Sequence, residues 1–237
     1  MVNKPVLMLL PGLMCDRRVW VDQINALSHA WECRVPNYEN ESDLAAMAET
    51  VLNEAPEQFA MAGHSMGGRV ALEVMRRAPE RVMRLALLDT GHTALASGEA
   101  GEKEVAGRLR LVKMAYEAGM RTMGSDWLQG MVHPARLHDK AFCDRILDMI
   151  ESKTPEMFEG QIKALIHRPD ATEVLKSIEC PTTFICGRDD SWSTPEKHYE
   201  MAALVKYSNV VTIEHCGHMS TMERPEAMNE ALMGWLG

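Results

Sequence analysis

The sequence predicts a doubly wound α/β fold, a mostly parallel sheet with helices on both faces, interrupted by an all-helical insertion. The first observation is that short apolar runs alternate with segments of helical periodicity. The runs are apolar along their length, as in strands buried on both faces of a parallel sheet. The second observation is that residues 91–178 contain no convincing strand. A chain of 237 residues fits one domain with one such insertion.

Before the insertion, four strands and three helices are expected in alternation. The strands are expected at 6–10, 32–35, 58–62 and 82–89, and the helices at 19–27, from Ser42 onward, and at 68–77. Pro11 and Pro36 end the first two strands, because proline cannot donate to a sheet ladder. Ser42 is expected to be the N-cap of the second helix, and Pro79 ends the third.

After the insertion, strands are expected at 182–186 and 210–214, with helices at 195–205 and 225–236. The insertion itself contains three apolar stripes at helical spacing. The stripes are Val105, Leu109, Val112 and Tyr116; Phe142, Ile146 and Met149; and Phe158, Ile162 and Leu165. We therefore expect residues 1–90 and 179–237 to form the core that contains the sheet, and 91–178 to form a separate helical unit.

The segment Gly63-His64-Ser65-Met66-Gly67 lies between an expected strand and an expected helix. A strand, a G-x-S-x-G pentapeptide and a helix together form the context of a nucleophile elbow. Small residues are needed on both sides of the serine, where the chain approaches its neighbours closely. The alternative is a glycine-rich turn whose serine only caps the helix.

A base and a carboxylate for this serine follow the last two expected strands. Asp189 and Asp190 come after the strand that ends at Gly187, and His218 comes after the strand that ends at Glu214. Parallel sheets place their sites at the carboxyl ends of the strands. A serine nucleophile needs a histidine that takes its proton and an acid that orients the histidine, in the order found here. The joint placement therefore predicts a catalytic triad.

These motifs resemble those of the α/β-hydrolase fold family, in its small esterase-like branch with a helical cap. The resemblance covers nearly the whole chain, through Leu10-Pro11-Gly12-Leu13, the Ser65 pentapeptide with Gly68, Gly187-Arg188-Asp189-Asp190 and Cys216-Gly217-His218. It implies Ser65 as nucleophile, Asp190 as acid and His218 as base, and residues 91–178 as the cap, or lid. The family's Gly-x-x-Asp pattern favours Asp190 over Asp189. His64 is expected to be structural.

The resemblance also implies an oxyanion hole formed by the backbone N–H groups of Leu13 and Met66. The sequence has Pro11-Gly12 where the family commonly has a His-Gly pair, so a polar side chain that often braces this loop is absent. The residues expected near the substrate pocket are Met14, Trp192 and Met219, with packing in the core or loops as an equal alternative for Trp192 and Met219.

The composition of the chain limits the classes of binding partner that can be expected. The formal net charge of −9 argues against nucleic-acid binding and against an anionic membrane surface, although a local field can still favour a small anion. The apolar run at the N-terminus is too short for a secretory signal. Six cysteines without a C-x-x-C pair are read as reduced, buried thiols of a cytoplasmic protein. No metal or organic cofactor is implied, and both a monomer and a homodimer remain open.

The leading hypothesis is therefore hydrolysis of a small carboxylic ester or lactone through an acyl-enzyme. Two other reactions on the same triad are carbon–carbon bond hydrolysis and cofactor-free perhydrolysis. A third hypothesis is a ligand-binding receptor on a hydrolase scaffold, but a pure binder has no need of an intact triad.

Overall fold

The computed structural model describes residues 4–237 and contains a six-stranded sheet in which all neighbouring strands are parallel. The strand order is β2-β1-β3-β4-β5-β6. The strands are β1 (Val6–Leu10), β2 (Glu32–Arg34), β3 (Phe59–His64), β4 (Val82–Leu88), β5 (Thr182–Gly187) and β6 (Ser208–Ile213). The predicted α/β fold is thus confirmed. Residues 1–3 of the expected core lie outside the described residues.

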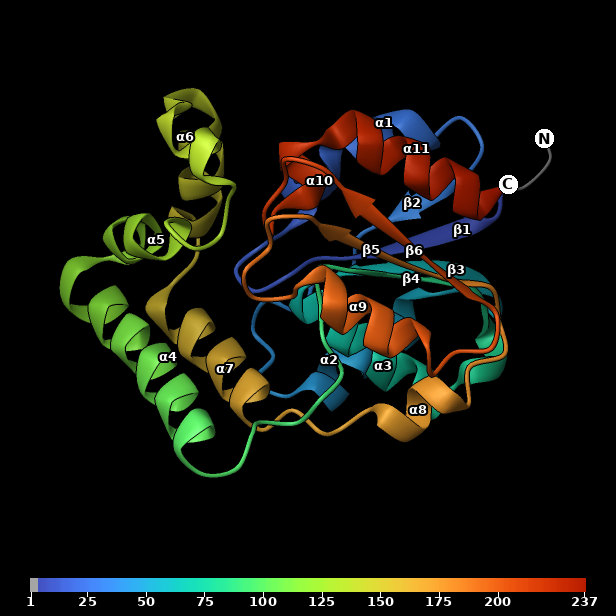
Figure 1. The fold of residues 1–237 in the computed structure, drawn as a ribbon, viewed down its shortest axis with the longest axis horizontal. Coiled ribbons are helices and arrows are strands. Elements are labelled where there is room, and N and C mark those ends of the chain that lie inside the picture. Colours follow the sequence, from blue (N-terminus) through green and yellow to red (C-terminus); the bar gives the residue numbers. More distant parts are fainter. Residues whose placement is uncertain (1–3) are drawn as a thin grey trace.

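Helices cover both faces of this sheet (Figure 1). One face carries α1 (Val21–Leu27), α10 (Ser220–Glu223) and α11 (Pro225–Leu236), which contact one another. The other face carries α2 (Leu44–Glu54), α3 (Met66–Arg77) and α9 (Pro195–Ala202). Because both faces are covered, β1, β3 and β5 are buried along their whole length, which explains their continuous apolar sequence.

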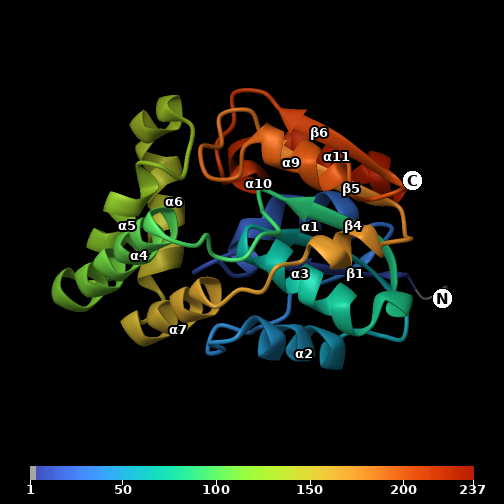
Figure 2. The same cartoon turned by 60° about the horizontal axis from the view of Figure 1, so that its bottom comes forward.

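The stretch between β4 and β5 is helical, and no strand is found in this part of the described chain. Its helices are α4 (Glu99–Ala118), α5 (Met120–Leu128), α6 (Lys140–Glu151), α7 (Pro155–Ile166) and α8 (Thr172–Lys176). Figures 1 and 2 show α4–α7 gathered beyond one end of the sheet, whereas α8 packs against α3. The strands point their carboxyl ends toward α4–α7, so the loops after the strands meet the insertion (Figure 1).

Several local expectations need correction. The N-cap of α2 is Asp43 rather than Ser42, because the Asp43 carboxylate accepts hydrogen bonds from the N–H groups of Ala45 and Ala46. The first turn of the helix expected at 19–27 is a 3₁₀ helix, Arg17–Trp20. The α9 helix ends at Ala202, and β6 begins two residues earlier than expected.

The first apolar stripe of the insertion is only partly buried. Val112 is buried in α4, but Leu109 and Tyr116 are 52% and 49% exposed. The reason is that α4 packs against α5 and α7 and leaves one side uncovered. Within residues 4–237, no helix has the length and hydropathy that crossing a membrane requires.

Candidate active site

Ser65 lies at the tight turn between β3 and α3. Its φ of 56° and ψ of −117° fall where few residues other than glycine are found, a strain typical of functional sites. A Cβ at Gly63 would lie 2.4 Å from the carbonyl oxygen of Gly67, and one at Gly67 would lie 2.2 Å from that of Leu10. The turn therefore requires both glycines. The Ser65 side chain makes no capping hydrogen bond to α3, which contradicts the alternative of a mere helix cap.

Gly67→Ala tests this close approach. We expect the free energy of unfolding to fall by about 1–3 kcal/mol or more, because the new methyl group would overlap the backbone of β1. Gly234→Ala in α11 is the matched control, since nothing lies within 4 Å of a Cβ there. Chemical denaturation of both variants measures the difference. Equal stability of the two variants would contradict the proposed packing at the elbow.

The side chains of Ser65, His218 and Asp190 form one hydrogen-bonded chain. His218 Nε2 lies 2.8 Å from Ser65 Oγ, and His218 Nδ1 lies 2.8 Å from Asp190 Oδ2. Asp190 Oδ1 accepts hydrogen bonds from the backbone N–H groups of Trp192 and Ser193, at 2.9 and 3.0 Å. Both oxygens of the buried carboxylate are therefore engaged, and one of them orients the imidazole.

Asp189, the other acid considered from the sequence, does not join this chain. Its side chain is 39% exposed, and its Oδ2 lies 3.7 Å from His133 Nε2. The structure therefore brings Asp190, and not Asp189, to the histidine that contacts Ser65.

The attraction between His218 and Asp190 determines the protonation states of both side chains. Burial by itself would lower the pKa of His218, but the charge of Asp190 and the hydrogen bond to it outweigh burial and raise that pKa. Burial likewise opposes ionisation of Asp190, and the attraction of His218 nevertheless lowers the pKa of this carboxyl. With Asp190 ionised, His218 carries its proton on Nδ1 and presents Nε2 as the acceptor for the Ser65 hydroxyl.

The backbone of His218 is held from two sides. Its N–H donates to the carbonyl oxygen of Met131 at 2.8 Å, and its carbonyl accepts from His64 Nε2 at 2.8 Å. His64 thus supports the loop that carries His218 and is not hydrogen-bonded to Ser65. Met131 belongs to the insertion, so the insertion contacts the loop of the base directly.

Glu223 adds to the contact between the insertion and the loop of His218. This residue was not identified from the sequence. Its buried carboxylate accepts from the N–H groups of Gly217 and Met219, both at 3.1 Å, on either side of His218. It also accepts from the N–H of His133 in the insertion at 2.8 Å. Burial raises the pKa of this carboxyl. One side chain therefore joins the insertion to the loop of the base.

Asp89, the residue that follows β4, has a fully buried carboxylate. Its Oδ1 accepts from the N–H of Gly187, and its Oδ2 accepts from the hydroxyl of Ser220. Asp89 therefore ties the start of the acid loop to the end of the base loop. In the sequence it is only the last residue of an apolar run, and no local pattern distinguishes it.

Leu13 and Met66, whose N–H groups are expected to form the oxyanion hole, lie shortly after β1 and at the start of α3. Among the described residues, the N–H groups of Leu13 and Met66 donate to no protein acceptor, so both are available to a ligand. The loop of Leu13 is braced without the histidine that the family commonly has. The Tyr38 hydroxyl donates to the carbonyl of Pro11 at 2.6 Å, and the N–H of Met14 donates to Gln161 Oε1 at 2.9 Å.

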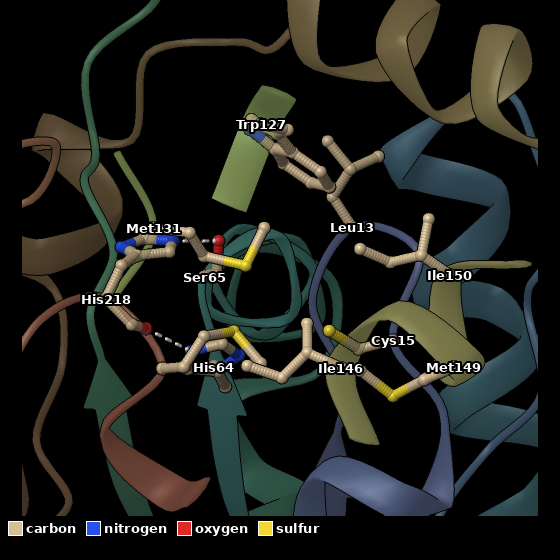
Figure 3. A pocket seen from close by; sticks show the side chains of 11 residues that line it. Leu13, Cys15, His64, Ser65, Trp127, Met131, Ile146, Met149, Ile150 and His218 are labelled. Carbon is tan, nitrogen blue, oxygen red and sulfur yellow. Dashed lines mark hydrogen bonds between the residues drawn. The ribbon is translucent and has the colours of Figure 1, made fainter. Parts of the chain in front are cut away.

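Two cavities adjoin Ser65. The smaller, of about 20 Å³, is mainly apolar, and Figure 3 shows its side chains around Ser65 and His218. It is lined by Leu13, Cys15, His64, Trp127, Met131, Ile146, Met149, Ile150 and Met219. The larger, of about 650 Å³, includes Trp127, Trp192 and many charged side chains. The site therefore offers a narrow, mainly apolar space and a much wider one with many charged side chains, and Ser65 lines both.

The three residues expected near the pocket have different surroundings. Trp192 lines the larger cavity, and its ring centroid lies 4.9 Å from that of His218. Met219 lines the smaller cavity. Met14 lines neither and is buried in the core. Cys15 does line the smaller cavity, but burial raises the pKa of its thiol to about 12, so it is no thiolate at neutral pH.

Comparison with known proteins places the chain in a family. The model of the alpha/beta hydrolase family matches residues 7–231. The chain belongs to the alpha/beta hydrolase family. This hydrolase is 25% identical to the (E)-2-((N-methylformamido)methylene)succinate hydrolase of Acinetobacter baylyi, over 97% of this chain and 89% of the relative. It is 23% identical to the pimeloyl-[acyl-carrier protein] methyl ester esterase of Nitrosomonas europaea, over 94% of this chain and 92% of the relative.

Solved structures agree with this family. A thermophilic esterase from Thermogutta terrifontis superposes on the hydrolase with a TM-score of 0.85 and 25% identity, covering 99% of this chain and 89% of the esterase. The enol-lactonase from Burkholderia xenovorans gives a TM-score of 0.86 over 99% of this chain and 92% of the enol-lactonase. At 20% identity, the second likeness shows the fold alone. With relatives and structural neighbours of this kind, the chain is an enzyme of the hydrolase class.

Proposed function

We propose that this hydrolase cleaves a small carboxylic ester or lactone through an acyl-enzyme formed on Ser65. The observation that carries the proposal is the hydrogen-bonded chain from Ser65 through His218 to Asp190, at the edge of two cavities. A relative and a solved structure that are both named as esterases support the ester substrate class.

In this mechanism, Ser65 Oγ attacks the carbonyl carbon while His218 Nε2 takes the hydroxyl proton. The N–H groups of Leu13 and Met66 receive the negative oxygen of the tetrahedral intermediate. The C–O bond to the leaving group breaks, and His218 returns the proton to the alcohol. Water, deprotonated by His218, then attacks the acyl-enzyme, and the carboxylic acid leaves as Ser65 regains its proton. Asp190 stabilises the imidazolium in both halves.

We also propose that residues 91–178 form a cap over a core of residues 1–90 and 179–237. The support comes from the side chains of Trp127, Met131 and Ile146, which line the smaller cavity beside Ser65. The hydrogen bonds from His218 to Met131 and from His133 to Glu223 fasten the same segment to the base loop. The cap would then select the substrate, while the core performs the chemistry.

The six cysteines are free thiols, which supports the proposal of a cytoplasmic enzyme.

The direct test of activity is a screen of p-nitrophenyl acetate, p-nitrophenyl butyrate and simple lactones with the purified chain. Turnover of at least one ester or lactone is expected. Tight ligand binding without any turnover would instead favour a receptor, and cleavage of carbon–carbon substrates or peracid formation alone would favour the other two reactions.

The pH dependence follows from His218. The base must be neutral to take the Ser65 proton, and its pKa lies above the ordinary histidine value of 6.5. The kcat/KM for p-nitrophenyl butyrate should therefore fall as pH drops through a single limb centred above 6.5. A profile from pH 5 to 9 measures this limb. A flat profile between pH 5 and 8 would contradict His218 as the base.

A further inference from the structure

The larger cavity beside Ser65 carries an excess of positive charge, although the whole chain has a formal net charge of −9. Its cationic lining residues are Arg69, Lys103, Arg108, Arg110, Arg168 and Lys197, and its acidic ones are Asp89, Glu104 and Glu200. One of these cations, Arg110, is paired with Asp126 at 2.6 Å, and the other five still outnumber the three acids, so the lining favours an anionic ligand.

Glu104, one of the three acids, is already engaged by two of these arginines. Arg168 holds Glu104 with two hydrogen bonds, from Nη1 at 2.7 Å and from Nη2 at 3.0 Å. Arg108 Nε donates to the same carboxylate at 2.9 Å. Since two guanidinium groups share one carboxylate, Glu104 cannot also neutralise a third.

Arg69 is that third guanidinium. It lies in the first turns of α3, one helical turn beyond Ser65. Among the described residues it forms no ion pair and donates one hydrogen bond, from Nη1 to the carbonyl of Thr93 at 2.9 Å. Because the side chain lines the cavity, its other N–H groups are available to a ligand.

The charge of Arg69 is poorly compensated. Burial lowers the pKa of Arg69 to about 9, and the nearby charges of Arg168 and Arg108 act in the same direction. The group is therefore still cationic at neutral pH, and among the described residues no carboxylate forms an ion pair with it. An anionic ligand would supply the missing partner.

We propose that Arg69 binds a carboxylate of the substrate, so that the enzyme acts on an ester or lactone that also carries a free carboxylate group. A guanidinium matches the two oxygens of a carboxylate with two parallel hydrogen bonds. This assignment rests on the proposed function of Ser65 and names the substrate class for it.

The test compares two esters with six-carbon acyl chains, p-nitrophenyl hexanoate and mono-p-nitrophenyl adipate, which differ in a terminal carboxylate. Wild type should prefer the adipate ester. Arg69→Met should reduce the ratio of kcat/KM for adipate over hexanoate by about 10- to 100-fold, as the loss of a charge-assisted bidentate contact predicts. Arg69→Lys should restore part of the ratio, because it keeps the charge. Arg77→Gln, on the same helix but outside the cavity, should leave the ratio unchanged.

A wild-type ratio near one, or an equal fall for both esters in Arg69→Met, would overturn the carboxylate site. A binding measurement separates this site from the proposed chemistry. Calorimetry with monomethyl adipate should give a Kd at least about 10-fold weaker for Ser65→Ala/Arg69→Met than for Ser65→Ala. If no ester turns over but this difference is found, the carboxylate site stands and the esterase proposal fails. If the Kd is the same, the carboxylate site fails whatever the enzyme catalyses.

Discussion

Ser65→Ala is expected to lower kcat for p-nitrophenyl butyrate by at least about 10³-fold, while the protein stays folded. The hydroxyl is the only group of the triad that bonds to the acyl carbon in the proposed mechanism, so its removal leaves no acyl-enzyme. The substitution removes one hydrogen bond, to His218 Nε2, and deletes no packing from the core. Residual turnover would come from the oxyanion N–H groups and from binding alone.

The matched control is Ser125→Ala. Ser125 is an exposed serine of α5 whose hydroxyl donates to the carbonyl of Arg121. Its removal should leave kcat within about 2-fold of wild type, in the range of ordinary surface substitutions. Unchanged turnover in Ser65→Ala would show that another group is the nucleophile. Circular dichroism of both variants separates lost chemistry from lost fold.

Asp190→Asn is the second large effect, with an expected loss in kcat of about 10³- to 10⁴-fold. The amide can keep the hydrogen bonds from Trp192 and Ser193, but it then offers an NH₂ group to His218 Nδ1. The imidazole must then carry its proton on Nε2, where it can no longer accept the proton of Ser65. In addition, the positive charge that develops on His218 when Ser65 attacks would no longer have a buried counter-ion.

Asp189→Asn is the control that the chain itself offers. Asp189 is adjacent in sequence and exposed, and its nearest basic partner is His133 at 3.7 Å. We expect its kcat to stay within about 3-fold of wild type, because exposed ion pairs contribute little. Parallel measurements of kcat for the two variants decide between the carboxylates. A large loss in Asp189→Asn with a small one in Asp190→Asn would move the acid by one residue.

The sheet, the elbow and the order of acid and base could be predicted because each depends on a local pattern. Gly63 and Gly67 mark the close approaches at the turn, and Asp190 and His218 follow apolar strands at one edge of the sheet. Parallel connections then bring these loops together without further information.

The remaining features of the site depend on contacts between residues that are far apart in the chain. Asp89 meets Ser220, and Glu223 meets His133, with no periodicity that links the partners. Trp127 comes near Ser65 only through the way the insertion folds, which three apolar stripes do not specify. In the sequence, Arg69 is an ordinary helix residue. Only the structure shows that it lines the larger cavity and that its one hydrogen bond among the described residues goes to a backbone carbonyl.

The most direct test of the account is to identify the residue that a fluorophosphonate modifies. This reagent phosphonylates an activated serine and mimics the tetrahedral intermediate, so labelling requires both Ser65 and a competent base. Peptide mass spectrometry should find one adduct per chain, on Ser65, with activity lost in proportion and with no adduct in Ser65→Ala. An adduct on another residue, or an enzyme that remains active and unlabelled, would contradict a serine hydrolase built on Ser65, His218 and Asp190.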